Sequence, residues 1–563
     1  MPNFVRTRWT VVLAIAIFLG VAGIVLESNF RQTDGHLIYA VDDAYIHMAM
    51  AKNLAGHGVY GVTADEFSSS SSSPLWTILL ACAFKIFGVH DAIPFIVNLV
   101  LACLILIVAY RFLLQSGLKS WAIFSSLLAV MFLTPMWAVV FSGMEHALHI
   151  LLVIVFIQYL KPVIQAEDLH IPGAQYWKGV LLTAALVLAR YESYALVGLA
   201  VVFLAVRRRR LLAGALVLSA VVPLVLYQAI SVAHGWFWLP NSIFIRAGGN
   251  FVPGMTSSTP TNPLPSIVHS LEHVLQIFWK NITDGPHLAC LVLSAILVLA
   301  MLLMRGRSFW KSAGSLLSLY VLMAVAHLVF GRIGYFFRYE AYLVASGSIL
   351  LASSLLELRT FSNRAETTRA QRNLATFMVV LCILLPAFPL GARSRDAFST
   401  TPTASRNIYE QQYQMGTFLR QNYPGAAVAV NDIGAVSYLG TIHLVDLVGL
   451  GSIDILRLQR AGNYTTESIG KICEEHGVSV ALLYDSWFER GNMHGVPSSW
   501  IRAGQWKILD NVICGDDIVS IYAVQPSQLR ELVQNLRRFS SALPARVVQS
   551  GMYLSENTAA PAR

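Results

Sequence analysis

Long apolar runs separated by short basic loops constrain the fold of this chain more than any other feature. Runs that fit membrane spans occupy residues 11–26, 92–113, 121–140, 146–160, 177–190, 194–206, 211–231, 287–304, 312–330, 341–357 and 374–390. A helix needs about 20 residues to cross a bilayer, so the shorter runs are expected to extend into their flanks. Only 13% of the residues are charged, and the mean hydropathy is +0.59. Both values are typical of a membrane protein, and the sequence predicts a mainly α, polytopic fold with about 11 transmembrane helices.

One further apolar run, 75–87, is short and is bounded by Pro74 and Gly88. Its length fits an interfacial helix better than a crossing. With this helix on the membrane surface, the N-terminus and the loop containing Arg207-Arg208-Arg209-Arg210 lie on the cytoplasmic side, as the positive-inside rule requires. The net charge of +9 is concentrated in such loops and does not indicate nucleic-acid binding. We therefore expect a multi-pass protein of the plasma (inner) membrane.

The tail beyond the last run has a different pattern. A helix is expected over 405–423 and another over 465–476, and β-rich runs occupy 426–430, 442–446, 478–484, 506–512 and 518–524. This alternation predicts a small extracytoplasmic α/β domain. The expected division is a membrane module, 1–390, with a large external loop at 27–91, followed by the domain 391–563. Residues after 525 are expected to form a helix and a polar end with no assigned role. Cys473 and Cys514 would be able to form one disulfide on an oxidising side of the membrane.

Polar motifs gather on the side that alternation assigns to the outside. They are Asp42-Asp43, Gly143-Met144-Glu145-His146, Arg190-Tyr191-Glu192, Leu239-Pro240-Asn241-Ser242 and the stretch Arg332 to Glu340. Charged groups beside a bilayer are costly unless they face water or take part in chemistry. The loops on the other side carry only charge and linker. This asymmetry predicts a functional site on the outer face.

The first external loop resembles that of a known superfamily. Asp42-Asp43-Ala44-Tyr45-Ile46 is followed by Asn53, Leu54, Gly56, His57 and Gly58, and then by Ser73-Pro74-Leu75-Trp76. This order resembles the GT-C glycosyltransferases, and most closely the actinobacterial arabinofuranosyltransferases that use decaprenyl-phosphoryl arabinose. Gly143-Met144-Glu145, Arg190-Tyr191-Glu192 and Pro240-Asn241-Ser242 are similar to turns of that family, from which Met144 and Tyr191 depart. The useful motifs cover about residues 1–250.

The resemblance implies a GT-C-like fold, a catalytic carboxylate in the first external loop and a polyprenyl-phosphate sugar donor. The expected reaction is inverting transfer, with arabinofuranose favoured, to an extracytoplasmic glycan, lipid or protein. Asp42 is the preferred general base, and Asp43 and Glu145 would position the acceptor or the base. Which of the two adjacent aspartates moves the proton stays open, and both are also plausible helix caps.

Cationic and amide groups supply candidates for the donor phosphate and the substrate. The planar guanidinium fork suits a phosphate better than an ammonium does, which favours Arg190, Arg332 and Arg338. Glu192 and Asn241 are further expected substrate contacts. Each has a structural alternative, because Arg190 and Glu192 are able to pair with one another and asparagine after proline is a common turn former.

Two other segments have competing interpretations. Segments around Asp432 and Asp446 resemble the same arabinosyltransferase group, and we expect these aspartates to be turn residues rather than parts of an acceptor groove. The serine run 68–73 is expected to be a mobile linker.

No cofactor is firmly implied. A divalent cation at Asp42-Asp43 stays open, because hard cations require several oxygen ligands. The expected partners are the lipid-linked sugar donor, the acceptor and the membrane. One alternative function is a transporter or flippase of lipid-linked sugars, although transporters carry polar groups within their spans and these runs are almost purely apolar. A second alternative is a non-catalytic scaffold subunit with a GT-C-like fold.

Overall fold

The computed structural model describes residues 2–167, 171–238, 241, 263–304, 309–362, 368–489 and 493–554. By their contacts the residues form two compact units. Unit 1 comprises Met1–Val25, Pro94–Leu226 and Thr259–Ser399, and unit 2 comprises Leu26–Ile93, Tyr227–Ser258 and Thr400–Arg563. The segment with Asp42-Asp43 is therefore grouped with the C-terminal part of the chain. The expected division into 1–390 and 391–563 stays a prediction.

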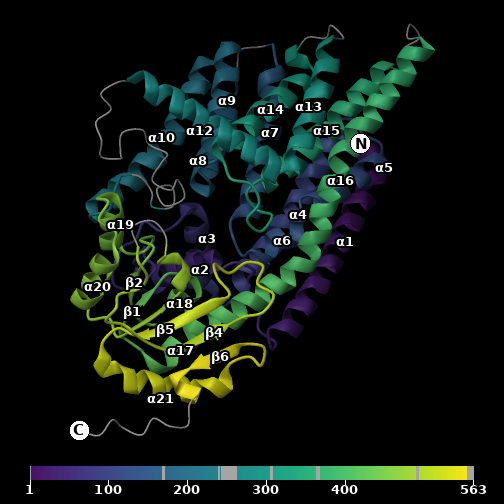
Figure 1. The fold of residues 1–563 in the computed structure, drawn as a ribbon. Helices are drawn as coiled ribbons and strands as arrows, with labels where there is room; N and C mark the ends of the chain where they lie inside the picture. Colours follow the sequence, from purple (N-terminus) through teal and green to yellow (C-terminus); the bar gives the residue numbers. More distant parts are fainter. Residues whose placement is uncertain are drawn as a thin grey trace, which may run out of the picture. The chain divides into compact units, whose positions relative to one another are not determined.

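Unit 1 is helical. It is built from α1 (Pro2–Gln32), α4 (Ala92–Gln115), α5 (Ser120–Leu133), α6 (Met136–Phe141), α7 (His146–Gln165), α8 (Gly173–Ala189), α9 (Ser193–Val206), α10 (Arg210–Ala233), α12 (Pro263–Asp284), α13 (Pro286–Met304), α14 (Ala313–Phe330), α15 (Ala341–Ser362), α16 (Arg369–Ile408) and the 3₁₀ turn Phe309–Lys311. Of these helices, α1, α4, α10 and α16 each continue at one end into unit 2. Figure 1 shows α7, α13, α14 and α15 packed side by side.

Eight helices among the described residues are long and apolar enough to cross a membrane. They correspond to eight of the eleven predicted spans and confirm a mainly α, polytopic membrane protein. The other three predicted spans, 121–140, 177–190 and 194–206, contain shorter helices. The run 121–140 is two helices, because α5 ends at Leu133 and Pro135, which has no N–H to donate, separates it from α6.

Unit 2 joins two early helices to an α/β fold. Its elements are α2 (Asp43–His57), α3 (Pro74–Phe87), the π-helical turn Tyr409–Tyr413, α17 (Gln414–Asn422), β1 (Ala427–Val430), α18 (Gly434–Leu439), β2 (His443–Asp446), α19 (Ile453–Arg460), α20 (Thr466–Glu475), β3 (Val480–Leu483), β4 (Ile501–Lys507), β5 (Ile518–Ala523), α21 (Leu529–Phe539) and β6 (Val548–Gly551), with 3₁₀ turns at Asp485–Trp487, Pro526–Gln528, Ser540–Ala542 and Met552–Leu554. The α3 helix confirms a short helix where one was expected, and its interfacial position stays a prediction.

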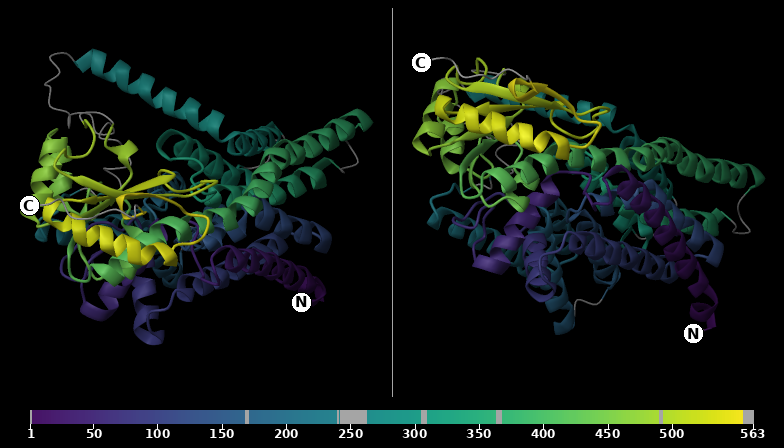
Figure 2. Two further views of the ribbon diagram at one scale, coloured as in Figure 1. Left: turned by 60° about the horizontal axis from the view of Figure 1, so that its bottom comes forward. Right: turned by 90° about the horizontal axis from the view of Figure 1, so that it is seen from below.

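The six strands form one sheet in the order β2-β1-β3-β5-β4-β6. The pairs β1–β2 and β1–β3 are parallel, and the remaining neighbours are antiparallel. Val428 and Val430 of β1 point into a core shared with α17, α18 and α21, whereas Ala429 points into a second core with α19 and α20. This alternation follows from the two-residue period of a strand. Figure 2 shows α21 lying along one side of the sheet.

Most of the expected α/β pattern of the tail is confirmed. Four β-rich runs coincide with β1, β2, β3 and β5, and the helix expected at 465–476 is α20. The strand expected at 506–512 was placed too late, because the chain turns after β4: Asp510 has φ +55°, and the Asn511 side chain accepts from the backbone N–H of Ile513 and Cys514. Strand β6 was not anticipated.

The structure overturns the suggested disulfide. All six cysteines are free thiols. The Cys473 side chain is buried in the core beneath α20, and the Cys514 thiol donates to Gln412 Oε1 at 3.4 Å. Location in the same tail is therefore not enough for a disulfide, because the fold places the two side chains in different environments.

Candidate functional site

Asp42 caps a helix, but not the helix that it precedes. Helix α2 begins at Asp43, and the Asp42 side chain makes no capping bond to it. Instead Asp42 Oδ2 accepts from the Gly434 N–H at 2.6 Å and Oδ1 accepts from the Ala435 N–H at 2.8 Å. These amides open α18 and have no partner within their own helix. The buried Asp42 carboxyl thus joins two segments that lie 392 positions apart in the sequence.

The absence of a side chain at Gly434 is needed for this contact. A β-carbon there would overlap both the backbone oxygen and the carboxyl group of Asp42. Helices α2 and α18 consequently pack closely, as Figure 1 shows beside β1 and β2.

A second carboxyl group from the α/β fold meets Asp42. Asp432 follows β1 and is hydrogen-bonded to the Asp42 carboxyl. Burial, followed by the charge of Asp432, raises the pKa of Asp42 well above its usual value. Burial likewise raises the pKa of Asp432. Like charges in contact cannot both ionise readily, so this pair retains a proton where isolated aspartates would lose theirs.

A π-helical turn supplies the partners of Asp432. Gln412 Nε2 donates to Asp432 Oδ2 at 2.8 Å, and the Tyr484 hydroxyl donates to the same oxygen at 3.1 Å. The Tyr484 hydroxyl also lies 2.7 Å from Gln411 Oε1. Gln411 and Gln412 both lie within the π turn and are fully buried. Such turns are frequent at functional sites. Asp432 was expected to be a turn residue, and no local signal in the sequence points to the two glutamines.

Asp43 is the more accessible of the two adjacent aspartates. It is half-buried, whereas Asp42 is buried. Its negative charge contributes to the raised pKa of Asp432. Asp43 is also the first residue of α2, so its backbone position is set by a helix whose start is held through Asp42. Unit 2 therefore presents the half-buried carboxyl of Asp43 beside the buried Asp42 and its half-buried partner Asp432.

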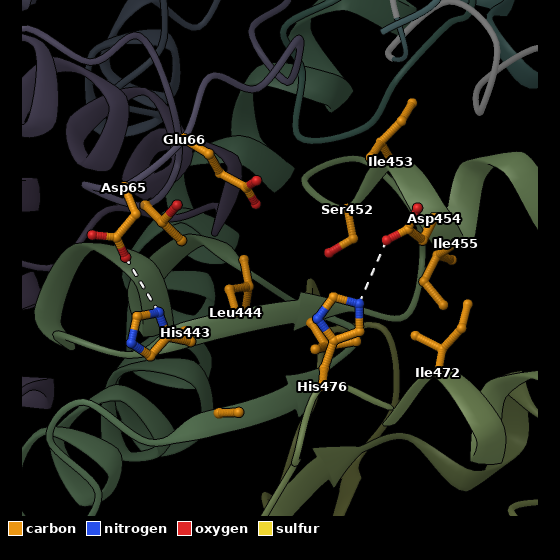
Figure 3. Close-up of a pocket in the computed structure, with 13 residues that line it drawn as sticks. Asp65, Glu66, His443, Leu444, Ser452, Ile453, Asp454, Ile455, Ile472 and His476 are labelled. Carbon is orange, nitrogen blue, oxygen red and sulfur yellow. Dashed lines mark ion pairs between the residues drawn. The ribbon is translucent and has the colours of Figure 1, made fainter. Parts of the chain in front are cut away.

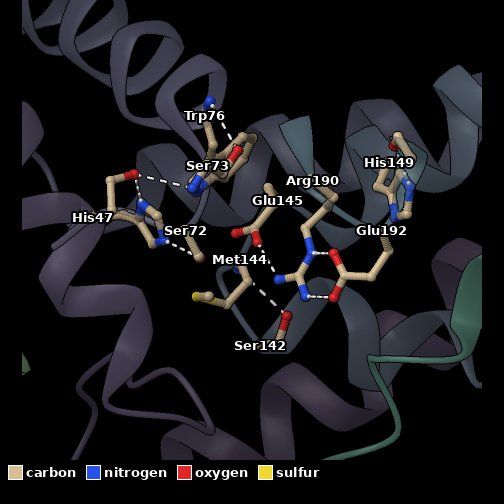
Figure 4. Close-up of polar contacts among 12 residues, drawn as sticks. His47, Ser72, Ser73, Trp76, Ser142, Met144, Glu145, His149, Arg190 and Glu192 are labelled. Atoms are coloured by element: carbon tan, nitrogen blue, oxygen red, sulfur yellow. Dashed lines mark hydrogen bonds and ion pairs between the residues drawn. The ribbon is translucent and has the colours of Figure 1, made fainter. Parts of the chain in front are cut away.

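The serine run is not a mobile linker. Ser68 to Ser73 are all buried, none more than 7% exposed. Ser70 Oγ donates to the Leu450 backbone oxygen at 2.8 Å, and Ser71 Oγ lies 3.0 Å from Thr77 Oγ1. His47 Nδ1 contacts the same Thr77 hydroxyl at 3.0 Å, and Figure 4 shows His47 turned toward Ser72. The composition was misleading because short hydroxyl side chains satisfy buried polar groups as well as they suit exposed linkers.

Ser73→Ala is expected to destabilise unit 2 by about 1 kcal/mol. Ser73 Oγ accepts from the Trp76 N–H at 3.3 Å and caps α3, a bond that alanine cannot make. Thermal unfolding of the detergent-solubilised protein measures the effect. Ser126→Ala is the control, since its hydroxyl bonds only one turn back on an exposed helical face. A melting temperature equal to that of the control would contradict the capping role.

In unit 1 the residues Glu145, Arg190 and Glu192 form one ionic cluster around the buried Arg190 side chain (Figure 4). Arg190 Nη1 donates to Glu145 Oε1 at 2.7 Å, while Nε and Nη2 bind the two oxygens of Glu192 at 3.0 and 2.5 Å. The Glu145 side chain is fully buried, and that of Arg190 is 3% exposed. Burial alone would raise the pKa of Glu192, but the Arg190 charge outweighs it and lowers that pKa. The pairing of Arg190 with Glu192, which was the structural alternative to a substrate role, is present, and Glu145 joins it.

A strained loop carries the remaining candidate arginines of unit 1. Gly334 and the three following aromatic residues, Tyr335 to Phe337, all have positive φ, which is costly for residues with side chains. Glu340 holds this turn by accepting from the Gly334 N–H at 2.9 Å. Arg393 donates to the Phe337 backbone oxygen at 2.8 Å and to Glu340 Oε1 at 2.6 Å. The partnership with Arg393 was not predicted, because that residue lies in the last long helix.

The strained turn places Arg338 against aromatic rings. Its guanidinium lies 4.7 Å from the ring centre of Tyr335 and 5.3 Å from that of Tyr339. Arg338 is buried, whereas Arg332 is exposed. The two arginines belong to one stretch of the sequence, but their environments in the structure differ.

Two other expected site residues have structural partners in unit 2. Asn241 is buried, and its Nδ2 donates to the Leu450 backbone oxygen at 3.1 Å; its neighbours Pro240 and Ser242 lie outside the described residues. Asp446 accepts from the backbone N–H of Val448 and Gly451, as expected of a turn residue. Burial raises the pKa of Asp446 to about 6.

A cavity of about 320 Å³ opens on unit 2 beside β2 (Figure 3). Figure 3 shows His443 turned toward Asp65 at 3.2 Å and His476 toward Asp454 at 3.5 Å. Burial, followed by the charge of Asp454, raises the pKa of Glu66 on the same wall. Within the described ranges, no three His, Cys, Asp or Glu side chains are arranged to hold a metal ion.

Three comparisons with known proteins bear on this geometry. Residues 406–522 match a family model described as a domain of unknown function, DUF8728. This segment contains Gln412, Asp432 and Tyr484. No curated protein matches the chain.

Among solved structures, the chain is similar to ArnT from Cupriavidus metallidurans. For the form bound to undecaprenyl phosphate the TM-score is 0.49 at 15% identity, covering 91% of this chain and 98% of that one. For the apo form the TM-score is 0.49 at 14% identity, covering 93% and 99%. At this level of similarity, the chemistry of the present chain follows from its own residues.

Proposed function

We propose that this protein is an inverting glycosyltransferase of the membrane, which moves a sugar from a polyprenyl phosphate to an extracytoplasmic glycan, lipid or protein. The observation that carries the proposal is the arrangement at Asp42-Asp43. The resemblance of the first loop pointed to a catalytic carboxylate there, and Asp42 is fixed by two backbone amides of α18. A carboxylate next to such an anchor is held in place, as a general base needs to be. The apolar helices and the positive-inside pattern support the membrane setting and an outward-facing site.

Asp43 is the base in this proposal, and Asp42 positions it. Both oxygens of Asp42 already accept hydrogen bonds, and Asp42 is buried, so it is poorly placed to reach an acceptor hydroxyl. The half-buried Asp43 is better placed. In the reaction, the acceptor oxygen attacks the anomeric carbon and gives its proton to Asp43. The bond from that carbon to the phosphate oxygen breaks, and the polyprenyl phosphate leaves with the electron pair and with inversion at the sugar.

Among the cationic candidates, Arg332 and Arg338 are the proposed phosphate ligands. Leaving-group phosphates are stabilised by guanidinium groups. Three nitrogens of Arg190 already donate to Glu145 and Glu192, so we assign it to holding these two carboxylates. Arabinofuranose is the favoured sugar on the resemblance of the first loop, and Glu192 and Asn241 are proposed to position substrate.

The test is transfer of radiolabelled sugar by the purified protein in liposomes. Synthetic polyprenyl-phosphate donors carrying arabinofuranose and several hexoses are compared, with short glycan and lipid acceptors. We expect turnover with one lipid-phosphate donor and inverted configuration in the product. Turnover with retained configuration would contradict the mechanism. Movement of intact lipid-linked sugar across the bilayer without transfer would favour the transporter, and neither activity would favour the scaffold.

A further inference from the structure

We infer that Asp432 is a positioning residue of this site: Asp42 and Asp432 act as one carboxyl pair that shares a proton and holds α18 against the start of α2. The expected effect on sugar transfer rests on the proposed function. The expected effect on folding does not. The motifs by which the first loop resembles the GT-C glycosyltransferases do not include Asp432.

The contacts that carry this inference come from three distant segments of unit 2. The first loop brings Asp42, the turn after β1 brings Asp432, and the π-helical turn brings Gln412. Asp42 is hydrogen-bonded at once to Asp432 and to the first amides of α18. Loss of the contact between the two carboxyls would therefore loosen the cap that aligns α2 and α18.

A hydrogen bond between two carboxyl groups requires a proton, because an ionised carboxylate is only an acceptor. The other contacts of the pair do not supply that proton: the backbone amides donate to Asp42, and Gln412 and Tyr484 donate to Asp432. These donors stabilise one negative charge on the pair. They do not remove the repulsion that a second charge would introduce at direct contact.

Several titratable groups face the pair from the elements around it. They are Asp43 and Tyr45 on α2, Tyr484 after β3, and Cys514 in the loop before β5. Burial raises the pKa of Tyr45, Tyr484 and Cys514, so these three groups stay neutral until high pH. Asp43 adds negative charge, which favours the protonated pair further.

The sign of the pH dependence follows from the direction of these shifts. A carboxyl whose pKa is higher in the folded than in the unfolded protein binds more protons when folded. Its contribution to stability is complete below the unfolded pKa, which is about 4 for aspartate, and is lost as the pH rises through the folded value. Deprotonation of the pair is thus expected to lower the melting temperature, and to lower transfer, on the alkaline side.

The decisive variant is Asp432→Asn. An asparagine amide donates to Asp42 without a titratable proton, so only Asp42 titrates and no second negative charge forms on the alkaline side. We expect the alkaline fall in melting temperature to disappear or to move upward by about one pH unit or more. The fall in transfer rate on the alkaline side is expected to change in the same way. Asp485→Asn is the matched control, since Asp485, like Asp432, accepts hydrogen bonds from two side chains in unit 2, here the hydroxyls of Ser520 and Tyr522, but has no carboxyl partner in those bonds.

A second variant keeps the test informative if Asp432→Asn folds poorly. Tyr484→Phe removes a donor that favours the ionised form of Asp432, so the alkaline limb should move to higher pH. Identical pH profiles of melting in wild type, Asp432→Asn and Tyr484→Phe would overturn the shared proton. If wild type shows no sugar transfer but its melting shows the expected limb, the proposed function fails and the carboxyl pair stands.

Discussion

Asp43→Asn is expected to lower the rate of sugar transfer by about 10²- to 10⁴-fold, the usual contribution of a general base. The amide has nearly the same shape as the carboxylate, but it does not accept a proton from the acceptor hydroxyl. Because the amide keeps the shape of the carboxylate and Asp43 is half-buried, the melting temperature is expected to stay close to that of wild type. Single-turnover transfer from the lipid-phosphate donor measures the chemical step.

The matched control is Asp42→Asn, which separates anchoring from catalysis. The NH₂ group of the new side chain would face the backbone N–H of Gly434 or Ala435, so two hydrogen-bond donors would meet with no acceptor between them. Leaving such a group unsatisfied costs about 1–3 kcal/mol, and we expect transfer and melting temperature to fall together. If Asp42→Asn instead stops transfer at unchanged stability while Asp43→Asn stays active, Asp42 is the base.

Arg190→Gln is expected to destabilise unit 1 by about 3–5 kcal/mol, as does removal of one partner from a buried ion pair. The variant would leave Glu145, which is fully buried, and Glu192 without their shared cation. Arg190→Lys should recover only part of the loss, because an ammonium group does not reproduce the fork that binds both carboxylates. Thermal unfolding in detergent at several pH values is the measurement.

The stability that Arg190→Gln loses is expected to depend on pH in one direction. The Arg190 charge lowers the pKa of Glu192, so the stability that it supplies is present above the unfolded glutamate pKa of about 4.3 and disappears as the pH falls. The difference between wild type and Arg190→Gln should therefore be largest near neutral pH and smaller in acid. The double variant Arg190→Gln with Glu145→Gln should be more stable than Arg190→Gln alone. An equal loss at every pH would show that packing, and not the ionic cluster, is responsible.

Local pattern alone determined the class of this protein and many of its elements. Apolar runs long enough to cross a bilayer predicted eight helices that the structure contains, because hydropathy and helix length are properties of consecutive residues. β-rich runs likewise predicted β1, β2, β3 and β5. The adjacent aspartates and the turn at Arg190 stood out for the same reason, since charge beside a membrane run is visible in sequence.

Only the tertiary structure decided what these residues contact. Asp42 caps α18 rather than α2, Asp432 joins it, and Glu340 is held by Arg393, although each partner lies far away in the chain. Burial turned the serine run from an expected linker into packed structure. Such outcomes depend on which distant amides, carboxyls and cations the fold brings within hydrogen-bond range. Spacing along the sequence constrains neighbours within a few residues, whereas the protonation and pairing of a buried carboxyl are set by groups that meet it only after folding.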